Sequence, residues 1–458
     1  PEEFKNSLSK FIVERNDNCT NCGKCEKVCV YKVHNRSKED MKKMAEPVSK
    51  LCRGCFRCVQ ECPIGALSIR INPEFKKIGG SYWKPEIIFS IFKQANDGKV
   101  PVSGAGYGGP FTGSFFDSMW TDMSEIVRPT RDGIHGREYI NTMVEIGRKL
   151  SGLKFDKNKN LEVEVPKVVP IPLPIIFDVS SYDLGKKIGI YSAIAANELN
   201  TYIIFDVNDI NTEIIKYSQN IIPLISYEDF LDIKNKKGEI WEAILMNSKM
   251  IEIRYSDEIL YDLKTIREIS KNLSKLIIVR IPLRRDLNQK VIELARNEID
   301  AVHIVGNHRG KEEIEIPDDQ KQFIADILRN LHLELVENSI RDNITIIVSG
   351  GIASAEHVPK AMLCGADAVA VDIVLAIALG NIVYDSQQNI LIEFKNSKEQ
   401  LSVSVQKIIN LIGAWHLQLL EVMGAMGIRE ARRLRGEIGR AIFFNDIDEE
   451  IFGEIFKK

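Results

Sequence analysis

The chain has 458 residues, of which 44% are hydrophobic and 27% are charged, and its formal net charge is −3. This length suits two or three domains, and the apolar content is enough for a sizeable core. A charge so close to zero gives no indication of a nucleic acid or a membrane surface as a partner. No uninterrupted apolar stretch reaches the roughly 18 residues of a membrane span, so we expect none.

Residues 1–75 hold two cysteine runs with the same spacing, C-x2-C-x2-C-x3-C. The runs are Cys19, Cys22, Cys25 and Cys29, and then Cys52, Cys55, Cys58 and Cys62, followed by Pro63. In two-cluster ferredoxins the fourth cysteine of each run binds the cluster of the other run. We therefore expect two 4Fe-4S clusters, one on Cys19, Cys22, Cys25 and Cys62 and one on Cys52, Cys55, Cys58 and Cys29.

Two other uses of these cysteines fit less well. Zinc sites prefer two well-separated ligand pairs. Disulfides need an oxidising compartment, whereas the first ten residues, PEEFKNSLSK, are charged and contain no apolar signal region. We therefore expect a cytoplasmic protein. Residues 1–75 carry 14 Lys+Arg against 10 Asp+Glu, which would suit an acidic donor such as a soluble ferredoxin, although scattered solvated charges explain it equally well.

Residues 76–165 predict an irregular, glycine-rich linker or lid segment. The stretch 103–113 contains a G-x-G-x-x-G spacing, but no apolar strand precedes it, so we do not assign a dinucleotide site. Three arginines follow that could clamp an anion or could make ordinary surface pairs, namely Arg128, Arg131 and Arg137.

Residues 166–458 alternate short β-rich runs with helical stretches such as Asp257–Leu273 and Asn288–Ile299. The expected strands are Pro172–Val179, Thr201–Asp206, Asn220–Ile225, Lys249–Ile253, Lys275–Ile281, Ala301–Val305, Ile344–Val348 and Asp367–Val371. Runs that are apolar throughout suit strands buried on both faces of a parallel sheet. Eight such units predict an α/β protein, a (β/α)8 TIM barrel with C-terminal helices, preceded by a small α+β two-cluster ferredoxin-like domain. A doubly wound open sheet is the alternative.

Barrel enzymes act at the C-terminal ends of their strands. Polar and glycine residues expected there to bind a cofactor are Asp178, Ser180, Gly306, Asn307, Ser349, Gly350, Gly351 and Asp372. Glycines after the seventh strand let backbone N–H groups approach a phosphate, and beside two one-electron clusters a flavin phosphate is the one to expect. A plain tight turn fits this local sequence equally well.

Two residues of the barrel are candidates for catalysis. Arg280 is a cation in an apolar strand, where it needs a partner, and near a flavin it could stabilise the reduced anionic ring. His308, in the loop Gly306–Gly310, could transfer a proton or could simply lie in a solvated loop.

The chain resembles the FMN-binding domain family of glutamate synthase, in the archaeal-type arrangement behind a two-cluster ferredoxin domain. The resemblance rests on FDVSSYDLGKK, YDLKTIREISKNLSKLIIVRIPL, VSGGIASAEHVPKAMLCGADAVAVDIVLAIALG and LEVMGAMGIREARRLRGEIGR, the last of which looks like the family's C-terminal helices. It implies FMN and an oxidoreductase acting on CH–NH2 donors, which reduces 2-iminoglutarate to glutamate. It also implies a separate glutaminase chain, a redox partner subunit and a multi-subunit complex.

Several positions depart from the family pattern. The family's lysine in the fifth strand is Arg280, its next glycine-rich loop is replaced by VGNHRG, and its Gly-Thr phosphate motif is occupied by Val371–Asp372. No cysteine follows Cys364, so the cysteine run for the family's 3Fe-4S cluster is missing, and we expect Cys364 to be a buried core thiol. These departures motivate an alternative function, an electron-transfer subunit with a modified or empty flavin site.

Overall fold

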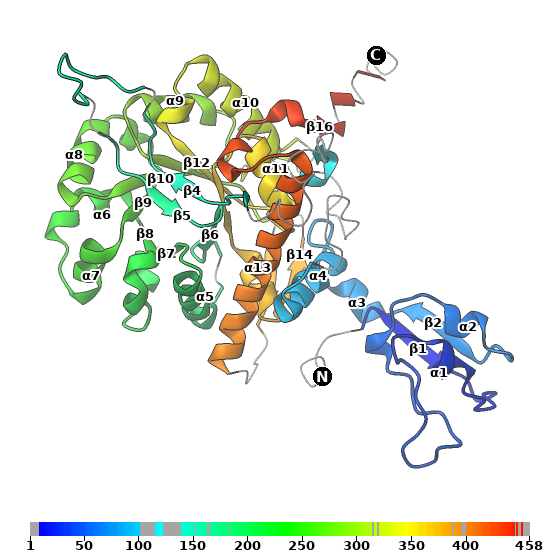
Figure 1. Ribbon diagram of the computed structural model, residues 1–458. Coiled ribbons are helices and arrows are strands. Elements are labelled where there is room, and N and C mark those ends of the chain that lie inside the picture. Colours follow the sequence, from blue (N-terminus) through cyan, green and yellow to red (C-terminus); the bar gives the residue numbers. More distant parts are fainter. Residues whose placement is uncertain are drawn as a thin grey trace. The chain divides into compact units, whose positions relative to one another are not determined.

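The computed structural model describes residues 9–451 apart from 101–114, 122–138, 151, 163–164, 183, 314–315, 318–319, 387–388, 395–399, 445 and 448–449. The chain divides into two compact units, Pro1–Gly80 and Ser81–Lys458 (Figure 1). The predicted glycine-rich stretch at 103–113 and the three arginines Arg128, Arg131 and Arg137 lie outside the described residues.

The first unit is a small α+β fold with two similar halves. Strands β1 (Phe11–Arg15) and β2 (Leu67–Ile71) pair antiparallel. Helices α1 (Lys24–Val28) and α2 (Arg57–Gln60) each begin just before the third cysteine of a run, after a left-handed residue at Gly23 or Phe56. The 3-10 turn η2 (Ser49–Leu51) precedes the second run, and α3 (Pro73–Lys77) ends the unit. This repetition places the two cysteine runs in equivalent loops.

The second unit is built on a closed barrel of eight parallel strands, as the sequence predicts. The order around the barrel is β10-β11-β12-β13-β6-β7-β8-β9. The strands are β6 (Ile175–Asp178), β7 (Ile203–Asp206), β8 (Ile221–Ile225), β9 (Met250–Arg254), β10 (Leu276–Pro282), β11 (Ala301–Val305), β12 (Thr345–Ser349) and β13 (Ala368–Val371). Closure rules out the open-sheet alternative, and it gathers the C-terminal ends of all eight strands at one mouth.

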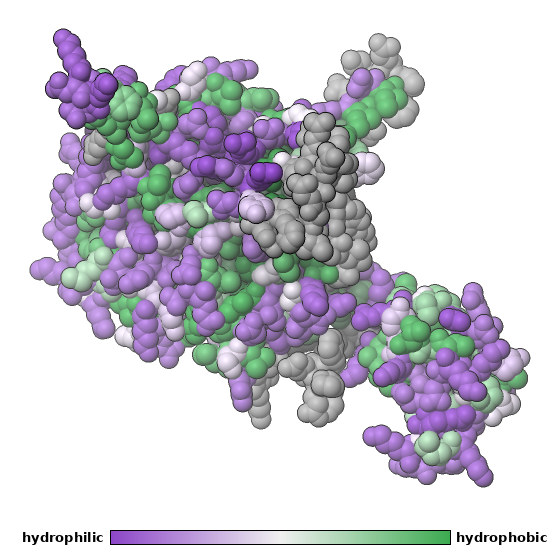
Figure 2. Space-filling model, viewed as in Figure 1, coloured by the Kyte–Doolittle hydropathy of each residue, from purple (hydrophilic) through white to green (hydrophobic). Residues whose placement is uncertain are grey.

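Helices surround the barrel (Figure 1). They are α5 (Lys186–Glu198), α6 (Tyr227–Leu231), α7 (Glu239–Asn247), α8 (Leu263–Leu273), α9 (Leu287–Arg296), α10 (Ile324–Glu337), α11 (His357–Leu363) and α12 (Ile373–Ala378). The predicted helix at 257–273 is split into the 3-10 turn η8 (Asp257–Leu260) and α8. Figure 2 shows mostly hydrophilic side chains interspersed with apolar ones over the outer helices, as amphipathic helices on a core require.

Several further elements lie outside the barrel. Antiparallel pairs form between β3 (Met119–Thr121) and β16 (Ala441–Phe443), β4 (Val144–Ile146) and β5 (Val169–Ile171), and β14 (Ile382–Asp385) and β15 (Ile390–Glu393). Short 3-10 turns are η3 (Phe115–Ser118), η5 (Val207–Asp209), η6 (Ile214–Asn220), η7 (Ile233–Asn235) and η9 (Arg341–Asn343).

The expectation of irregular structure throughout 76–165 is wrong for α4 (Pro85–Asp97), a helix of 13 residues. Its apolar residues fall on one face, and this face packs against α13 (Leu401–Met426). The buried Trp415 Nε1 donates to Gln94 Oε1 at 2.9 Å, and Asn410 Nδ2 donates to the Ala95 carbonyl at 2.9 Å. The helix is therefore stabilised by tertiary packing on a segment more than 300 residues later.

Helix α13 is long and apolar enough to cross a membrane by length and hydropathy, the one such helix in the described chain. However, 56% of its most apolar window is buried, and it packs on α4 and α5, so we interpret it as a core helix. It ends at Met426 because Gly427 adopts a left-handed φ of 74°. The predicted helices beyond it are present only in part, since 428–440 contains the 3-10 turns η10 (Ala431–Arg433) and η11 (Ile438–Arg440) and helical residues return only at 444, after β16.

Candidate functional site

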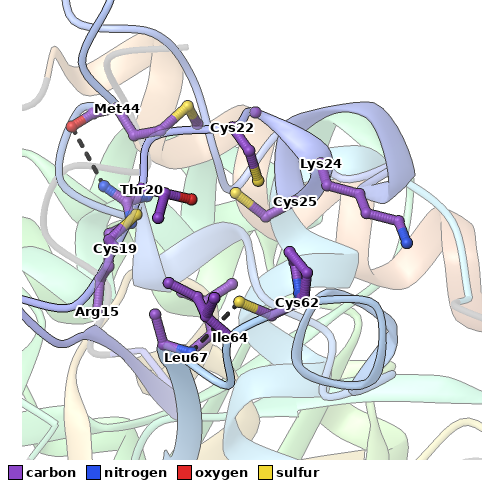
Figure 3. Close-up of a pocket in the computed structure, with 13 residues that line it drawn as sticks. Arg15, Cys19, Thr20, Cys22, Lys24, Cys25, Met44, Cys62, Ile64 and Leu67 are labelled. Atoms are coloured by element: carbon purple, nitrogen blue, oxygen red, sulfur yellow. Dashed lines mark hydrogen bonds between the residues drawn. The ribbon is translucent and has the colours of Figure 1, made fainter.

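The cysteines of the first unit surround two separate cavities. One is lined by Cys19, Cys22, Cys25 and Cys62, and the other by Cys29, Cys52, Cys55 and Cys58. Figure 3 shows the sulfur atoms of Cys22, Cys25 and Cys62 facing one space, with Cys19 on its other side. The structure thus brings the fourth cysteine of each run to the other run, in the pairing that the spacing predicts for two clusters.

The thiols around each cavity affect one another electrostatically. Burial, together with the neighbouring Cys29, Cys52 and Cys55, raises the pKa of Cys58 to about 11. Burial likewise raises the pKa of Cys25. Four thiols held this way are poorly suited to remain free thiolates, and positively charged iron would relieve their repulsion.

Backbone N–H groups point at three of the sulfur atoms. Asn21 N lies 3.4 Å from Cys19 Sγ, Gly54 N lies 3.4 Å from Cys52 Sγ, and Ala66 N lies 3.3 Å from Cys62 Sγ. Such bonds are a common means of tuning iron–sulfur clusters. Within the described residues, no three His, Cys, Asp or Glu side chains are arranged to hold a single metal ion.

At the barrel mouth a chain of buried polar side chains crosses five strands. Arg280 of β10 donates from Nη2 to Asp178 Oδ2 at 2.9 Å and from Nη1 to Glu252 Oε1 at 3.2 Å. Glu252 Oε1 also lies 2.7 Å from His303 Nδ1, and His303 Nε2 lies 2.9 Å from Ser349 Oγ. Because a carboxylate can only accept, His303 Nδ1 carries a proton and donates it to Glu252.

The charges of this network stabilise one another. Burial opposes ionisation of Asp178, but Arg280 lowers the pKa of this carboxyl well below its usual range, and Ser180 and Ser181 donate to it as well. Burial also disfavours the charge of Arg280, but Asp178 and Glu252 raise its pKa. Asp178 and Glu252 thus share the single guanidinium of Arg280, so the group is better suited to a ligand that donates an N–H than to an anion.

Sequence reasoning placed Asp178, Ser180, Arg280 and Ser349 at the site but missed Glu252 and His303. Both are fully buried in strands, within the runs MIEIR and AVHIV. The signal was the same as for Arg280, a polar side chain in an otherwise apolar strand, which requires a partner. One oxygen, Glu252 Oε2, is buried without a hydrogen-bond partner in the described part of the chain.

The glycine loop after β12 packs directly against the loop after β11. Gly350 and Gly351 have φ of 95° and 71°. A Cβ on Gly350 would lie 2.5 Å from the Gly306 carbonyl oxygen, and one on Gly351 would lie 2.8 Å from the Arg309 carbonyl. The N–H groups of Gly350, Gly351 and Ile352 make no hydrogen bond to another described residue. The loop is thus more than a tight turn, because it leaves three adjacent donors available to an anion.

Asp372 lies where a second phosphate contact is expected, and it is buried. Its carboxylate accepts a 2.5 Å hydrogen bond from the backbone N–H of Ile373, at the start of α12. Burial raises the pKa of Asp372 to about 7, with a further contribution from the negative charge of Asp178. The same two carboxylates contribute to the raised pKa of Tyr182, whose largest cause is burial.

The predicted proton-transfer residue His308 lies in a different cluster from Arg280. Its Nε2 is 3.0 Å from Asp385 Oδ1, and Arg309 Nε donates to the same oxygen at 2.9 Å. The His308 carbonyl accepts from Trp83 Nε1 at 2.8 Å. Asn307 holds its own loop, since its Oδ1 accepts from the backbone N–H groups of Arg309 and Lys311. These contacts give both side chains a structural task, while their predicted roles remain predictions.

Cys364, the ninth cysteine, is fully buried in the second unit, and burial raises the pKa of its thiol to about 12. Its Sγ lies 3.8 Å from Met119 Sδ. These surroundings are those of a core thiol.

Each of the two units contains a region that matches a known protein family. Residues 242–429 match the conserved region of glutamate synthase, and residues 11–63 match a 4Fe-4S dicluster domain. An archaeal-type glutamate synthase (NADPH) of Dehalococcoides mccartyi is 25% identical over 93% of this chain and 94% of its own length. An archaeal glutamate synthase (NADPH) of Archaeoglobus fulgidus is 26% identical over 97% of both chains.

Among solved structures, the flavin-binding domain of baker's yeast flavocytochrome b2 is 12% identical and covers 74% of this chain and 86% of its own, with a TM-score of 0.43. That likeness is too distant to inform the site. The two matched regions and the near full-length relatives carry the assignment instead. The chain is an oxidoreductase of the kind that acts on CH–NH2 donors; it is similar over nearly its whole length to archaeal-type glutamate synthases, and its match to the conserved region of glutamate synthase follows a match to a 4Fe-4S dicluster domain.

Proposed function

We propose that the chain is an iron–sulfur FMN oxidoreductase that forms glutamate by reducing 2-iminoglutarate. Electrons enter at two 4Fe-4S clusters held by the eight cysteines of the first unit and are used at the mouth of the barrel. The observation that carries the proposal is the convergence of four cysteines on each of two cavities, in a chain that also contains the glutamate synthase region.

A flavin is the group that would join one-electron clusters to a two-electron reduction, because it accepts electrons singly and delivers them as a pair. The backbone N–H groups of Gly350, Gly351 and Ile352 fit its phosphate, since all three lack partners among the described residues. Asp372 fits only when it is protonated. A pKa of about 7 makes the neutral form available, and a nearby phosphate would favour it further.

The polar side chains at the barrel mouth are suited to bind an imine substrate. A protonated imine is a cation, and Asp178 and Glu252 place two carboxylates against the single guanidinium of Arg280. Glu252 Oε2 is a buried acceptor without a donor, a situation that costs about 1–3 kcal/mol. We propose that this oxygen stabilises the N–H of the substrate, while Arg280 holds the two carboxylates in place. This arrangement makes Arg280 less suited to stabilise an anionic flavin.

The relatives' names add NADPH as a source of reducing power. For this chain we propose a cytoplasmic complex in which a soluble ferredoxin or another redox subunit delivers the electrons to the clusters. A separate glutaminase chain would supply ammonia.

The test uses anaerobically purified protein. Iron and acid-released flavin are counted on one sample, and glutamate formation is measured with a chemically reduced donor, 2-oxoglutarate and ammonium. The proposal predicts one FMN, about eight irons, as two 4Fe-4S clusters require, and glutamate formation that needs both ammonium and the donor.

Asp372 favours one other function, an electron-transfer subunit with an empty flavin site. Eight irons without flavin, even after FMN is added, would support that function and refute the enzyme.

A further inference from the structure

The two cysteine cavities are alike in their ligands but differ in one buried side chain each. In both cavities one cysteine is exposed (Cys22 or Cys55), one is buried (Cys25 or Cys58) and two are intermediate. This matching exposure means that solvent access does not distinguish the cavities. A difference between the clusters must then come from the other groups that line the cavities.

Arg15 lines the first cavity, with Cys19, Cys22, Cys25 and Cys62. Its Nη1 donates to the Met44 carbonyl at 3.2 Å and to the Ala45 carbonyl at 2.8 Å, which fixes the guanidinium beside the cavity (Figure 3). Its Nε and Nη2 are buried and have no hydrogen-bond partner among the described residues. A fixed cation with unpaired N–H groups therefore lies at this cavity.

His34 lines the second cavity, with Cys29, Cys52, Cys55 and Cys58. The side chain is 1% exposed, and neither ring nitrogen has a hydrogen-bond partner in the described chain. Burial and the charge of Arg15 both lower the pKa of His34, so the ring is neutral and offers one N–H. Arg53 and Arg57 also line this cavity, but both are exposed, where solvent and salt screen their charges.

Buried donors without acceptors are rare in folded proteins, and each requires an explanation. The sulfur atoms of an iron–sulfur cluster are acceptors, and a cluster becomes more negative when it is reduced. A hydrogen bond or a positive charge beside a cluster therefore stabilises the reduced form and raises the potential. Both cavities have backbone N–H groups on their sulfur atoms, those of Asn21 and Ala66 in the first and that of Gly54 in the second. The first cavity adds a cation with two unpaired nitrogens, whereas the second adds one buried imidazole ring.

We propose that Arg15 and His34 are hydrogen-bond donors to the two clusters, Arg15 to the cluster of Cys19, Cys22, Cys25 and Cys62 and His34 to the other, and that the Arg15 cluster has the higher potential. This inference rests on the cluster binding of the proposed function. It assigns an order to the clusters, in which the first electron taken up resides on the Arg15 cluster.

The test is a redox titration of the anaerobic full-length protein, followed by electron paramagnetic resonance, with iron counted on every sample. The wild type should titrate in two resolved steps. Arg15→Gln should make reduction in the upper step at least tenfold less favourable, about 59 mV for one electron, and should shift the lower step less, because Arg15 acts on the second cavity only at a distance, through its charge. His34→Phe should shift only the lower step in the same direction. His34→Gln, which keeps an N–H donor, should restore part of the shift.

Two variants serve as controls. Arg70→Gln removes an exposed cation of the same unit, one that pairs with Glu14, and should leave both steps in place. Arg15→Lys keeps the charge and should shift the upper step less than Arg15→Gln, which protects the test if Arg15→Gln loses iron.

The outcomes separate the two proposals. Full iron with unchanged potentials in the Arg15 and His34 variants, or an Arg15 variant that moves the lower step as far as the upper one, overturns the donor assignment and leaves the proposed function intact. Wild-type protein without two cubane clusters overturns both.

Discussion

Removing the charge of Arg280 tests whether the polar network holds the barrel mouth together. Arg280→Met leaves Asp178 and Glu252 as two uncompensated carboxylates, both fully buried. Breaking a buried ion pair by removing one partner costs about 3–5 kcal/mol. Here two carboxylates lose their cation, so we expect a loss at the upper end of that range.

The structure provides a control in the adjacent strand. Arg254 is the register partner of Arg280 and also pairs with an aspartate, Asp206, but its side chain is 47% exposed. An exposed pair contributes about 0–1 kcal/mol, so Arg254→Met should have little effect. Both variants are compared with wild type by urea unfolding, with the near-ultraviolet circular dichroism of the second unit as the signal.

A third variant separates charge from packing. Asp178→Asn/Glu252→Gln/Arg280→Met removes all three charges together, and replacing a whole buried ionic group is often nearly neutral. It should therefore recover much of the stability that Arg280→Met loses. The electrostatic explanation is wrong if the triple variant is the less stable of the two, or if Arg280→Met unfolds at the same urea concentration as Arg254→Met.

Three further predictions concern other parts of the molecule. Cys62→Ser should lose iron from the first cluster, whereas Cys364→Ser, which changes a buried thiol of the second unit, should keep about eight irons; equal iron in the two variants would contradict the ligand assignment. Gly351→Ala should lower stability by more than about 1 kcal/mol, because it places a Cβ at a left-handed residue against Arg309, and it should weaken FMN binding measured by fluorescence; unchanged binding would argue against the phosphate site. The raised pKa of Asp372 means that the folded state retains this proton where the unfolded state has lost it, so this contribution to stability is present below about pH 4 and is lost as the pH rises through about 7. Asp372→Asn should therefore gain thermal stability relative to wild type at pH 8 compared with pH 5.5, and it should bind FMN more tightly at pH 8; a pH-independent difference would mean that the carboxyl is ionised throughout.

The barrel could be predicted because its strands carry a strong local signal. Runs such as LIIVRI and ITIIV are apolar at every position, and they form β10 and β12 of the closed sheet. The cysteine pairing could also be predicted, because the spacing that wraps a cubane leaves the fourth cysteine of each run free for the other cluster.

Features that depend on distant contacts could not be predicted. The tasks of Glu252 and His303 become apparent only when β9, β10 and β11 are neighbours in the barrel. Helix α4 is a second example, because its apolar face packs against α13, a segment that is distant in the sequence. The contact of His308 with Asp385 could not be predicted for a similar reason, because the two residues are 77 positions apart in the sequence.

The contact between α4 and α13 has a consequence for how the protein is made. About 300 residues separate Asp97 from Leu401, and a ribosome adds about 5–20 residues per second. Helix α4 also packs on α12, which is made earlier, but the part of its apolar face that α13 covers has no partner for roughly 15–60 s. During that interval apolar side chains of α4 are exposed on the nascent chain, which makes this helix a natural target for a chaperone that binds amphipathic segments. A ribosome that stalled before Leu401 would release a chain prone to aggregate, even though all eight strands of the barrel had already been made.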